Sequence, residues 1–342
     1  MEHRKPTLQD VAEYAGVSTA TVSRSLNQPD KVKPDVYVTI MQAIRALGYV
    51  PHGAARALAS RKTKTVGAVV PTIDNAIFAE AIQHLQAELS QAGYTLLLAN
   101  SSYCLEEEHR EVSVLLSRGI DGLVLVGEEH HPDVFEAIER RALPYVNLWI
   151  YNPESRYSCI GFDHQRAGLQ IAEHLLALGH QHFAAISAIR LYNDRATQRL
   201  AGIRNGVLAQ GIEWPDAQIF ECRYSVEQGR LALHNLLERF PQTTAVVCGN
   251  DILALGALWA ARERQIAVPE QLSITGFDNL EIIHALSPAL TTVNAPSRRM
   301  GYYAADYLLR QFNATDSASH SIERLELDAE LIVRETTAIA LR

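Results

Sequence analysis

The chain has 342 residues, of which 47% are apolar, and a formal net charge of −8. This length leaves room for two or three domains with a sizeable buried core. No run of 18 apolar residues occurs, so we expect no membrane span, and the N-terminus lacks the apolar segment of a secretory signal. We therefore expect a cytoplasmic globular protein. The spacing of the cysteines favours buried thiols over disulfides or metal ligands: Cys104, Cys159, Cys222 and Cys248.

The charge is divided unevenly along the chain. Residues 1–64 hold ten Lys and Arg against five Asp and Glu, a net charge of +5, and they include all five lysines. Residues 65–342 hold the other 21 basic and 34 acidic residues, a net charge of −13. This asymmetry indicates a small module that seeks anions, attached to an acidic body that nucleic acid would repel.

The stretch 7–27 has the pattern of two short helices joined by a tight turn. Gly16 stands where the turn needs a left-handed backbone, Ser18 can cap the second helix, and Thr7 with Asp10 resembles a capping box. Such a pair is a helix-turn-helix, whose second helix enters the DNA major groove. A helical hairpin inside a larger core is the alternative. The apolar positions are Leu8, Val11, Ala12, Ala15, Val22 and Leu26.

A third helix is predicted from about Asp35 to Leu47, where Gly48 ends it. These helices make a headpiece of residues 1–50. Residues 51–64 follow as a hinge or linker in which an Ala-rich segment, 54–59, is too short to persist as a helix in water. The segment is either an ordinary linker, which periodicity alone favours, or a helix that folds when it docks on DNA.

From residue 65 onward, buried strand patterns alternate with helix patterns, which predicts parallel sheets covered by helices on both faces. The alternation is too long for one small sheet and fits two Rossmann-like lobes, with a ligand in the crevice at the carboxyl ends of the strands. The expected strands are 66–70, 95–99, 122–126, 145–148, 183–187, 245–248, 272–277 and 331–337, and the expected helices are 78–91, 106–117, 165–178, 198–210, 226–239 and 252–264.

Two other classes of protein are alternatives to a DNA-binding regulator. An enzyme is disfavoured because no P-loop, GxGxxG after the first strand, GxSxG or HExxH occurs. His130 and His131 form a doublet near acidic residues, but we predict a solvated loop because no third organised metal ligand is evident. A periplasmic sugar-binding protein would share the body, but it needs a signal peptide and has no use for a helix-turn-helix.

Three segments, 7–27, the turn 48–51 and 55–58, resemble the headpiece and hinge of the lactose/galactose repressor (LacI/GalR) family, and the resemblance continues through essentially the whole remaining chain. It implies that two hinge helices of a dimer lie in the minor groove, where Leu58 wedges between base pairs. Thr19 and Ala20 fall at base-reading positions, but both are small, so base readout should be lean. The implied DNA contacts are Thr7, Ser18, Thr19, Ala20, Thr21, Ser23, Arg24, Asn27, Lys31, Lys33, Tyr49, Ala55 and Leu58.

The body, 65–342, resembles a type I periplasmic-binding-protein fold. The resemblance implies an N-lobe of about 65–163 and 294–325 and a C-lobe of about 164–293 and 326–342, with crossings near Asp163, Asn294 and Leu325. Where several relatives place an Asp after the fourth strand, this chain has Trp149, which can stack on a sugar ring but cannot accept hydroxyl protons. The implied effector-binding residues are Asn75, Ile77, Phe78, Trp149, Arg199, Tyr224, Asn250 and Asp278.

These patterns together predict a transcriptional regulator that is not an enzyme, most often a repressor, and that needs no cofactor or metal. Its expected partners are a second copy of the chain, a near-palindromic double-stranded operator, and a sugar or sugar acid. The segments 78–80 and 100–111 resemble those of repressors that sense gluconate-like acids. No leucine heptads follow residue 337, so nothing supports a tetramer-forming coiled coil.

Overall fold

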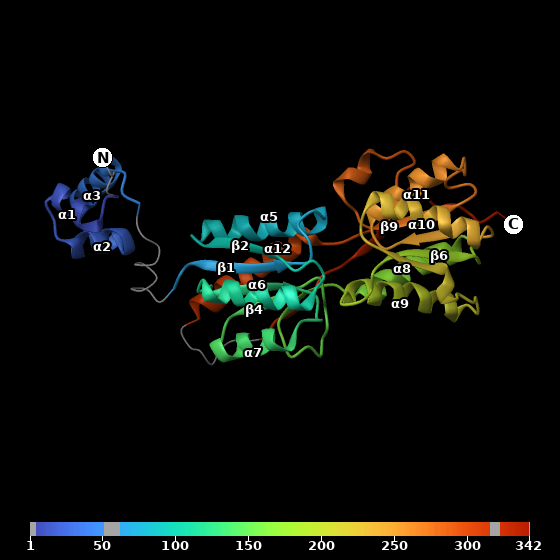
Figure 1. The fold of residues 1–342 in the computed structure, drawn as a ribbon, viewed down its shortest axis with the longest axis horizontal. Helices are drawn as coiled ribbons and strands as arrows, with labels where there is room; N and C mark the ends of the chain where they lie inside the picture. Colours follow the sequence, from blue (N-terminus) through green and yellow to red (C-terminus); the bar gives the residue numbers. More distant parts are fainter. Residues whose placement is uncertain (1–4, 51–61, 315–321, 342) are drawn as a thin grey trace. The chain divides into compact units, whose positions relative to one another are not determined.

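A computed structural model of the chain describes residues 5–50, 62–314 and 322–341. The chain divides into two compact units, residues 1–64 and residues 65–342 (Figure 1). Residues 51–61 lie outside the described residues, and with them the predicted hinge helix that carries Ala55 and Leu58.

The headpiece, residues 5–50, has the predicted helix-turn-helix. Its elements are α1 (Leu8–Ala15), α2 (Thr19–Asn27), the 3-10 turn η1 (Pro29–Lys31) and α3 (Pro34–Leu47). They enclose a small core of buried apolar side chains, Val11, Ala12, Val22, Ile40 and Ala43. A core of this size gives a module of only marginal stability.

Local sequence explains where the headpiece helices begin and end. Thr7 and Asp10 form the predicted capping box, in which each side chain bonds the other's backbone N–H. Gly16 ends α1 in the left-handed conformation, with φ +66°, which an L side chain rarely adopts. Ser18 Oγ accepts the backbone N–H of Thr21 at 3.2 Å and so caps α2. These local residues therefore determine the turn that positions α2 against α1.

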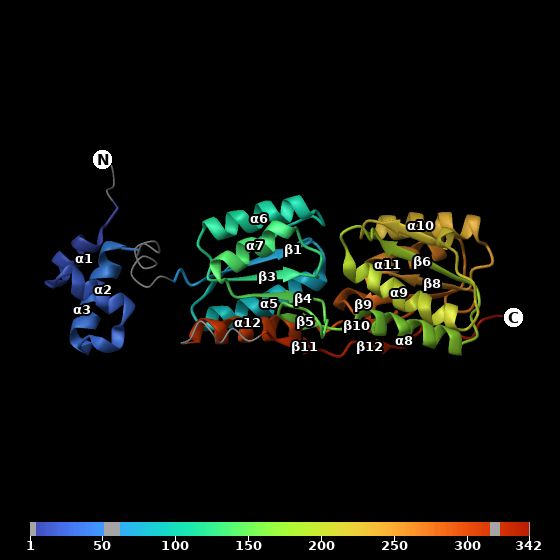
Figure 2. The same ribbon diagram turned by 90° about the horizontal axis from the view of Figure 1, so that it is seen from below.

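The N-lobe is built on a sheet of parallel strands in the order β11-β5-β4-β3-β1-β2. Helices α5 and α12 cover one face and α6 and α7 the other (Figures 1 and 2). The strands are β1 (Thr65–Val70), β2 (Thr95–Asn100), β3 (Gly122–Val126), β4 (Tyr145–Leu148), β5 (Cys159–Gly161) and β11 (Arg324–Glu326), and the helices are α5 (Ala76–Gln91), α6 (Leu105–Ser117), α7 (Pro132–Arg141) and α12 (Ser297–Asn313).

The C-lobe repeats this plan, with the strand order β12-β10-β9-β8-β6-β7, in which only the edge strand β12 is antiparallel to its neighbour. Helices α8 and α9 pack together on one face and α10 and α11 on the other (Figure 1). The strands are β6 (Phe183–Ala188), β7 (Ile219–Cys222), β8 (Ala245–Cys248), β9 (Ser273–Asp278), β10 (Thr291–Asn294) and β12 (Glu330–Ile332), and the helices are α8 (His164–Ala177), α9 (Asp194–Ala209), α10 (Val226–Arg239) and α11 (Asp251–Glu263), with 3-10 turns η2 (Asp216–Gln218) and η3 (Glu281–Ala285).

The chain passes between the two sheets three times. The crossings follow β5, β10 and β11, and each contains a buried apolar residue, respectively Phe162, Ala295 and Leu327. Buried side chains from both lobes join in one core cluster. The predicted fold class, an all-α headpiece followed by a two-lobed α/β body with parallel sheets, is confirmed.

Several details of the prediction need correction. The strand expected over 331–337 is only Glu330–Ile332. The residues after it bond to residues 274–291 through the side chains of Arg334, Glu335 and Thr336 as well as through backbone groups. The strands β5, β7, β10 and β11 were not among the expected strands, and each is only three or four residues long. Helices α7 and α12 were also not among the expected helices.

Candidate nucleic-acid interface and ligand cleft

The second headpiece helix presents a polar, exposed face. Thr19, Ala20 and Arg24 on α2 are exposed, whereas Thr21 and Ser23 are half-buried. Lys31 and Lys33, in the connector to α3, are exposed as well. The remaining predicted contacts differ in position: Thr7 and Ser18 are exposed cap residues, Asn27 ends α2, and Tyr49 packs against the headpiece core.

A second group of predicted residues meets on the C-lobe side of the body. Arg199, on α9, is buried; its guanidinium lies 3.5 Å from the centroid of the Phe277 ring and donates to the carbonyl of Gly249. Asn250 follows Gly249 and caps α11 by accepting the N–H of Leu253 at 2.9 Å. Asp278 is the last residue of β9. Asn250 and Asp278 lie at the carboxyl ends of the neighbouring parallel strands β8 and β9, and Arg199 reaches this end of the sheet from α9.

The N-lobe residues are positioned by α5 and β4. Phe78 and Trp149 meet edge to face, with ring centroids 4.8 Å apart, and both are buried. Asn75 caps α5 by accepting the N–H of Ile77 at 3.3 Å, and Ile77 packs in the core. Trp149 adopts a left-handed backbone, with φ +58°, which is uncommon for a large side chain and costs free energy.

Three cleft residues were missed by the sequence argument. His164, the first residue of α8, is fully buried, and its Nε2 donates to the carbonyl of Trp149 at 2.9 Å. Tyr103 follows β2, and its ring lies 6.1 Å from that of Tyr224. Arg195 lies one helical turn before Arg199, and this spacing is the signal that could have identified it.

Asp194 and Arg195 fasten the C-lobe to the N-lobe; we call these contacts the latch. Asp194 Oδ2 accepts the backbone N–H of Glu128 at 2.6 Å, and Arg195 Nη1 donates to the carbonyl of Val126 at 3.1 Å. The two side chains also pair with each other at 2.7 Å and are buried. The latch bonds backbone on both sides of Gly127, whose φ of +92° is a conformation that L side chains rarely adopt. A Cβ there would overlap Arg195 Nη1.

Replacing Gly127 with Ala should break the latch and let the lobes separate. Each charge-assisted hydrogen bond that is lost contributes about 1.5–3 kcal/mol. We expect a larger radius of gyration of the ligand-free protein by small-angle X-ray scattering. Gly179→Ala is the matched control, because Gly179 has a similar φ of +83° and nothing within 4 Å of the added Cβ. An unchanged radius in Gly127→Ala would mean that the latch does not hold the lobes.

Burial changes the protonation of two cleft side chains. Desolvation raises the pKa of Asp278 to about 8, because the nearby Arg199 offsets only part of the cost of burying the charge. Desolvation lowers the pKa of His164 well below its usual range, and the positive charge of Arg199 lowers it further. At neutral pH, Asp278 therefore holds a proton for most of the time, and the His164 ring is neutral.

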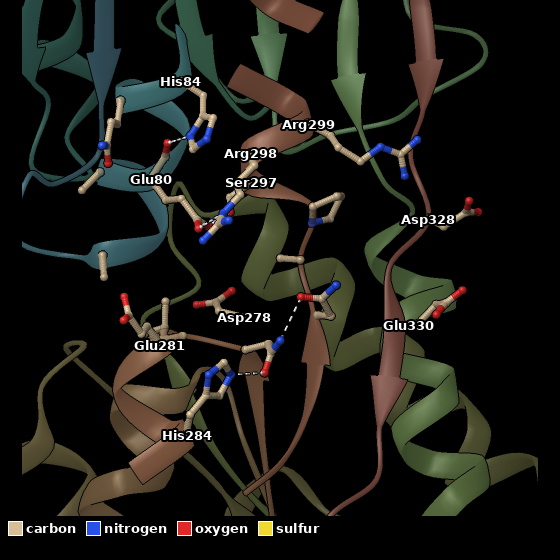
Figure 3. A pocket seen from close by; sticks show the side chains of 18 residues that line it. Glu80, His84, Asp278, Glu281, His284, Ser297, Arg298, Arg299, Asp328 and Glu330 are labelled. Carbon is tan, nitrogen blue, oxygen red and sulfur yellow. Dashed lines mark hydrogen bonds and ion pairs between the residues drawn. The ribbon is translucent and has the colours of Figure 1, made fainter. Parts of the chain in front are cut away.

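The space beside Arg199 is nearly closed, with a cavity of only about 10 Å³ between α9 and the ends of β6 and β8. A larger hollow of about 1070 Å³ lies among the start of α5, the start of α12, and the residues between β9 and η3 (Figure 3). Among the predicted effector residues, Asp278 is the one that lines this hollow. In its wall, Glu80 accepts hydrogen bonds from Ser297 and Arg298.

The predicted solvated loop around His130 is wrong. His130 is buried, with Nδ1 at 2.9 Å from Glu108 and Nε2 at 3.0 Å from the Gly127 carbonyl. It therefore supports the loop that the latch grips. His131 caps α7. His131, Asp133 and His109 on α6 form a group of three side chains whose possible metal-ligand atoms lie within 4.8 Å of one another. His109 could not be recognised from local patterns, because only the folded chain brings α6 beside the start of α7.

Within the described residues, no helix is both long enough and apolar enough to cross a bilayer. A helix-turn-helix module joined to a two-lobed body with a closed polar cleft is the architecture of a ligand-responsive DNA-binding regulator.

Comparison with known proteins agrees with this class. The family model for bacterial regulatory proteins of the lacI family matches residues 7–52, and the model for a periplasmic binding protein-like domain matches residues 172–337. The HTH-type transcriptional regulator GntR of Escherichia coli K12 is 32% identical over 309 residues, which cover 90% of this chain and 92% of that protein.

Two solved structures extend the likeness over nearly the whole chain. The lac repressor dimer bound to operator and the anti-inducer ONPF is 27% identical with a TM-score of 0.85, and the match covers 98% of this chain and 100% of that one. The complex of the regulator CelR with cellobiose is 29% identical with a TM-score of 0.71, covering 97% and 99%. The chain belongs to the lacI family of bacterial transcriptional regulators.

Proposed function

We propose that the chain is a dimeric repressor that binds a near-palindromic operator through residues 1–64. Its affinity for the operator falls or rises when a sugar-like metabolite binds between the lobes. The observation that carries this proposal is the joining of a basic helix-turn-helix unit to an acidic two-lobed unit. The relatives are named as transcriptional regulators, which supports regulation and not catalysis as the activity. The expected compartment is the cytoplasm.

In the headpiece, the exposed face of α2 is suited to the major groove. Arg24 can reach base edges or phosphates, whereas Thr19 and Ala20 are small enough to contact a thymine methyl or to allow close approach. The exposed lysines Lys31 and Lys33 suit phosphate oxygens, which fix the register without reading sequence. We assign further backbone and hinge contacts to Thr7, Ser18, Thr21, Ser23, Asn27, Tyr49, Ala55 and Leu58.

We assign an exposed apolar groove on the C-lobe as the surface that binds a second copy of the chain. The groove has a volume of about 840 Å³, and Trp259, which lines it, is 55% exposed. Exposed apolar patches of this kind mark interaction surfaces. The related lac repressor is a dimer on its operator, and a two-fold axis would place two headpieces on two half-sites. The groove is lined by Leu255, Leu258, Trp259, Ile266, Val268, Leu286 and Pro288, among others.

The effector is assigned to the cleft formed by Arg199, Asn250, Asp278 and Tyr224 on one side and by Phe78 and Trp149 on the other. Asn75 and Ile77 support the N-lobe side. Polar side chains with aromatic faces are suited to polyhydroxyl ligands, and the related CelR is solved with cellobiose. A ligand shifts operator affinity only through its different affinities for the open and closed arrangements, and DNA shifts ligand affinity by the same factor.

Selection from a random DNA library with the full-length protein tests the function directly. We expect the selected sequences to share a two-fold symmetric motif. Binding should weaken by about 10³–10⁵-fold between 50 and 200 mM salt if six to ten phosphates are contacted. Sugars and sugar acids are then screened for a change in that affinity. Selected DNA without symmetry, or the absence of any ligand effect, would contradict the proposal.

A further inference from the structure

Three possible metal ligands meet where α6 packs beside the start of α7. One nitrogen each of His109 and His131 and one carboxylate oxygen of Asp133 lie within 4.8 Å of one another, and we call this group the histidine cluster. The two histidines are half-buried and Asp133 is exposed, so an ion in solution can reach all three. The roles proposed above for DNA, effector and dimer binding use none of these residues.

The two imidazole rings of the cluster are held side by side. They stack with 4.7 Å between centroids and 8° between planes, so each ring restricts the motion of the other. Ligands that are already ordered lose less conformational entropy when an ion binds. His131 Nδ1 also lies 3.8 Å from Asp133 Oδ2. Bonds of about 2.0–2.2 Å to one tetrahedral ion place ligand atoms roughly 3.3 Å apart, so the cluster closes with shifts on the order of 1 Å.

The protonation of His131 suits metal binding. Its Nδ1 accepts the backbone N–H of Asp133 at 3.2 Å and so carries a lone pair and no proton. A metal ion needs the same unprotonated nitrogen. Binding through Nδ1 exchanges one hydrogen bond at a half-exposed helix end for a coordination bond. Within the described part of the chain, the ring nitrogens of His109 have no hydrogen-bond partner.

Charge and ligand type define the class of ion. Three glutamates, Glu106, Glu107 and Glu108, stand in the first turn of α6, and Glu106 lies three residues before His109 and thus on the same helix face. Among the described residues, Asp133 forms no ion pair with a lysine or an arginine. Two imidazoles and a carboxylate suit Zn²⁺, Co²⁺ and Ni²⁺, whereas Mg²⁺ and Ca²⁺ prefer oxygen ligands alone.

The histidine cluster adjoins the loop that the latch bonds. His130 Nδ1 lies 2.9 Å from Glu108, and its Nε2 lies 3.0 Å from the Gly127 carbonyl, so this buried ring already ties the loop to α6. The next residue along each segment, His109 after Glu108 and His131 after His130, belongs to the cluster. An ion bound there would therefore add a second tie between the same two segments, on the more exposed side.

We propose that His109, His131 and Asp133 bind one divalent transition-metal ion, of which zinc is the representative, and that this ion fastens residues 127–131 to α6. Water fills the position that the three protein ligands leave open, as in other zinc sites with three protein ligands. The site is separate from the effector cleft and does not depend on the identity of the effector. Metal availability would thereby act on the loop to which Asp194 and Arg195 bond.

Calorimetric titration of the chelator-treated, full-length protein with zinc chloride tests the site. We expect one zinc ion to bind per chain. Nickel and cobalt should compete with zinc for these residues, whereas magnesium and calcium should not, because the two imidazoles favour transition-metal ions. The absence of zinc binding, or equal competition by magnesium, would overturn the proposal.

Three single variants locate the ion. His109→Gln removes one ring, Asp133→Asn removes the carboxylate charge, and His131→Asn removes the other ring but keeps an oxygen that can cap α7, since Asn is a preferred N-cap. Each should lower zinc affinity by ~30-fold or more, because even the loss of a group that only supports a ligand commonly costs about 10–100-fold. Circular dichroism checks that each variant is folded.

His182→Gln is the matched control for His109→Gln, because it makes the same change at an exposed histidine just before β6 in the C-lobe. Zinc affinity should be unchanged in this variant. Equal losses in His109→Gln and His182→Gln would overturn the assignment, as would unaltered affinity in all three ligand variants.

Cobalt absorption identifies the type of ligand. The thiol of Cys104, which bonds Glu106 at 3.2 Å, is a competing ligand close in sequence to His109. Cobalt bound by a thiolate shows an intense charge-transfer band in the near ultraviolet, whereas cobalt bound by nitrogen and oxygen shows only weak visible bands. We expect no thiolate band. Its appearance would overturn the proposed ligand set.

Hydrogen exchange followed by mass spectrometry tests whether the ion fastens the loop. Zinc should slow amide exchange in peptides that cover residues 127–131 of the unaltered protein, because a second tie makes local opening of this segment rarer. Zinc should have no such effect in His109→Gln. Equal exchange with and without zinc in the unaltered protein would overturn the action of the ion on the loop.

Discussion

Replacing Val22 with Asp should abolish operator binding while the body keeps its fold and its ligand affinity. Val22 is fully buried in a headpiece core of five buried apolar residues. Burying an unpaired carboxylate there costs several kcal/mol, which exceeds the stability that so small a module can have. The body has its own extensive core and forms a separate compact unit. Fluorescence anisotropy with selected operator DNA measures the loss, and calorimetry measures ligand binding.

Val38→Asp is the control for this change. It introduces the same charge into the same headpiece, on α3, at a position that is 53% exposed. The extra negative charge should weaken DNA binding by no more than about tenfold, since only one exposed charge is altered. Operator binding by Val22→Asp at the level of Val38→Asp would show that the helix-turn-helix unit is not what binds DNA.

Replacing Trp259 with Glu should convert the dimer that we propose into monomers. An aromatic residue at the centre of an interface typically contributes about 2–4 kcal/mol. Because the two subunits are related by a two-fold axis, each contributes one substituted residue, and two new carboxylates would be buried in the same apolar interface. The dissociation constant of the dimer should rise by more than ~10³-fold, which analytical ultracentrifugation measures. Operator affinity should fall with it, because a monomer reaches only one half-site.

The control for the interface change lies on the opposite face of the same lobe. Leu208, on α9, is 45% exposed, and Leu208→Glu makes a similar apolar-to-acidic change away from the groove. This variant should remain a dimer. If Trp259→Glu sediments as the unaltered protein does, the groove on α11 is not the dimer interface, and the second copy must bind elsewhere.

The sequence predicted those parts of the molecule that depend on local patterns. Buried apolar runs such as 66–70 and 122–126 marked strands, and Gly16 with Ser18 marked the turn of the headpiece, because each signal depends on neighbours in the chain. The cleft was predicted only in part. Arg199, Asn250 and Asp278 were named from the family resemblance, and the structure brings them to one end of the C-lobe sheet.

What the sequence missed depends on contacts between distant residues. His164 carried no signal in its own stretch of sequence, and its ring is oriented by a hydrogen bond to the Trp149 carbonyl, 15 residues away. The latch is another case, since Asp194 and Glu128 are 66 residues apart. His130 was misread because Glu108, its partner, lies on a different helix. Hydrophobic periodicity cannot reveal such pairs, because it depends on neighbours in the chain and these partners lie 15 to 66 residues apart.

The three crossings also set an order for how the protein is made. The N-lobe sheet ends with β11, at residues 324–326, and one of its covering helices is α12, at residues 297–313. The lobe therefore cannot be completed until almost the whole chain has left the ribosome, although its first strand begins at residue 65. The headpiece needs only its own first 50 residues, and domains fold as units during synthesis, N-terminal first. A nascent chain can therefore have a folded DNA-binding headpiece long before the ligand-binding body that regulates it is complete.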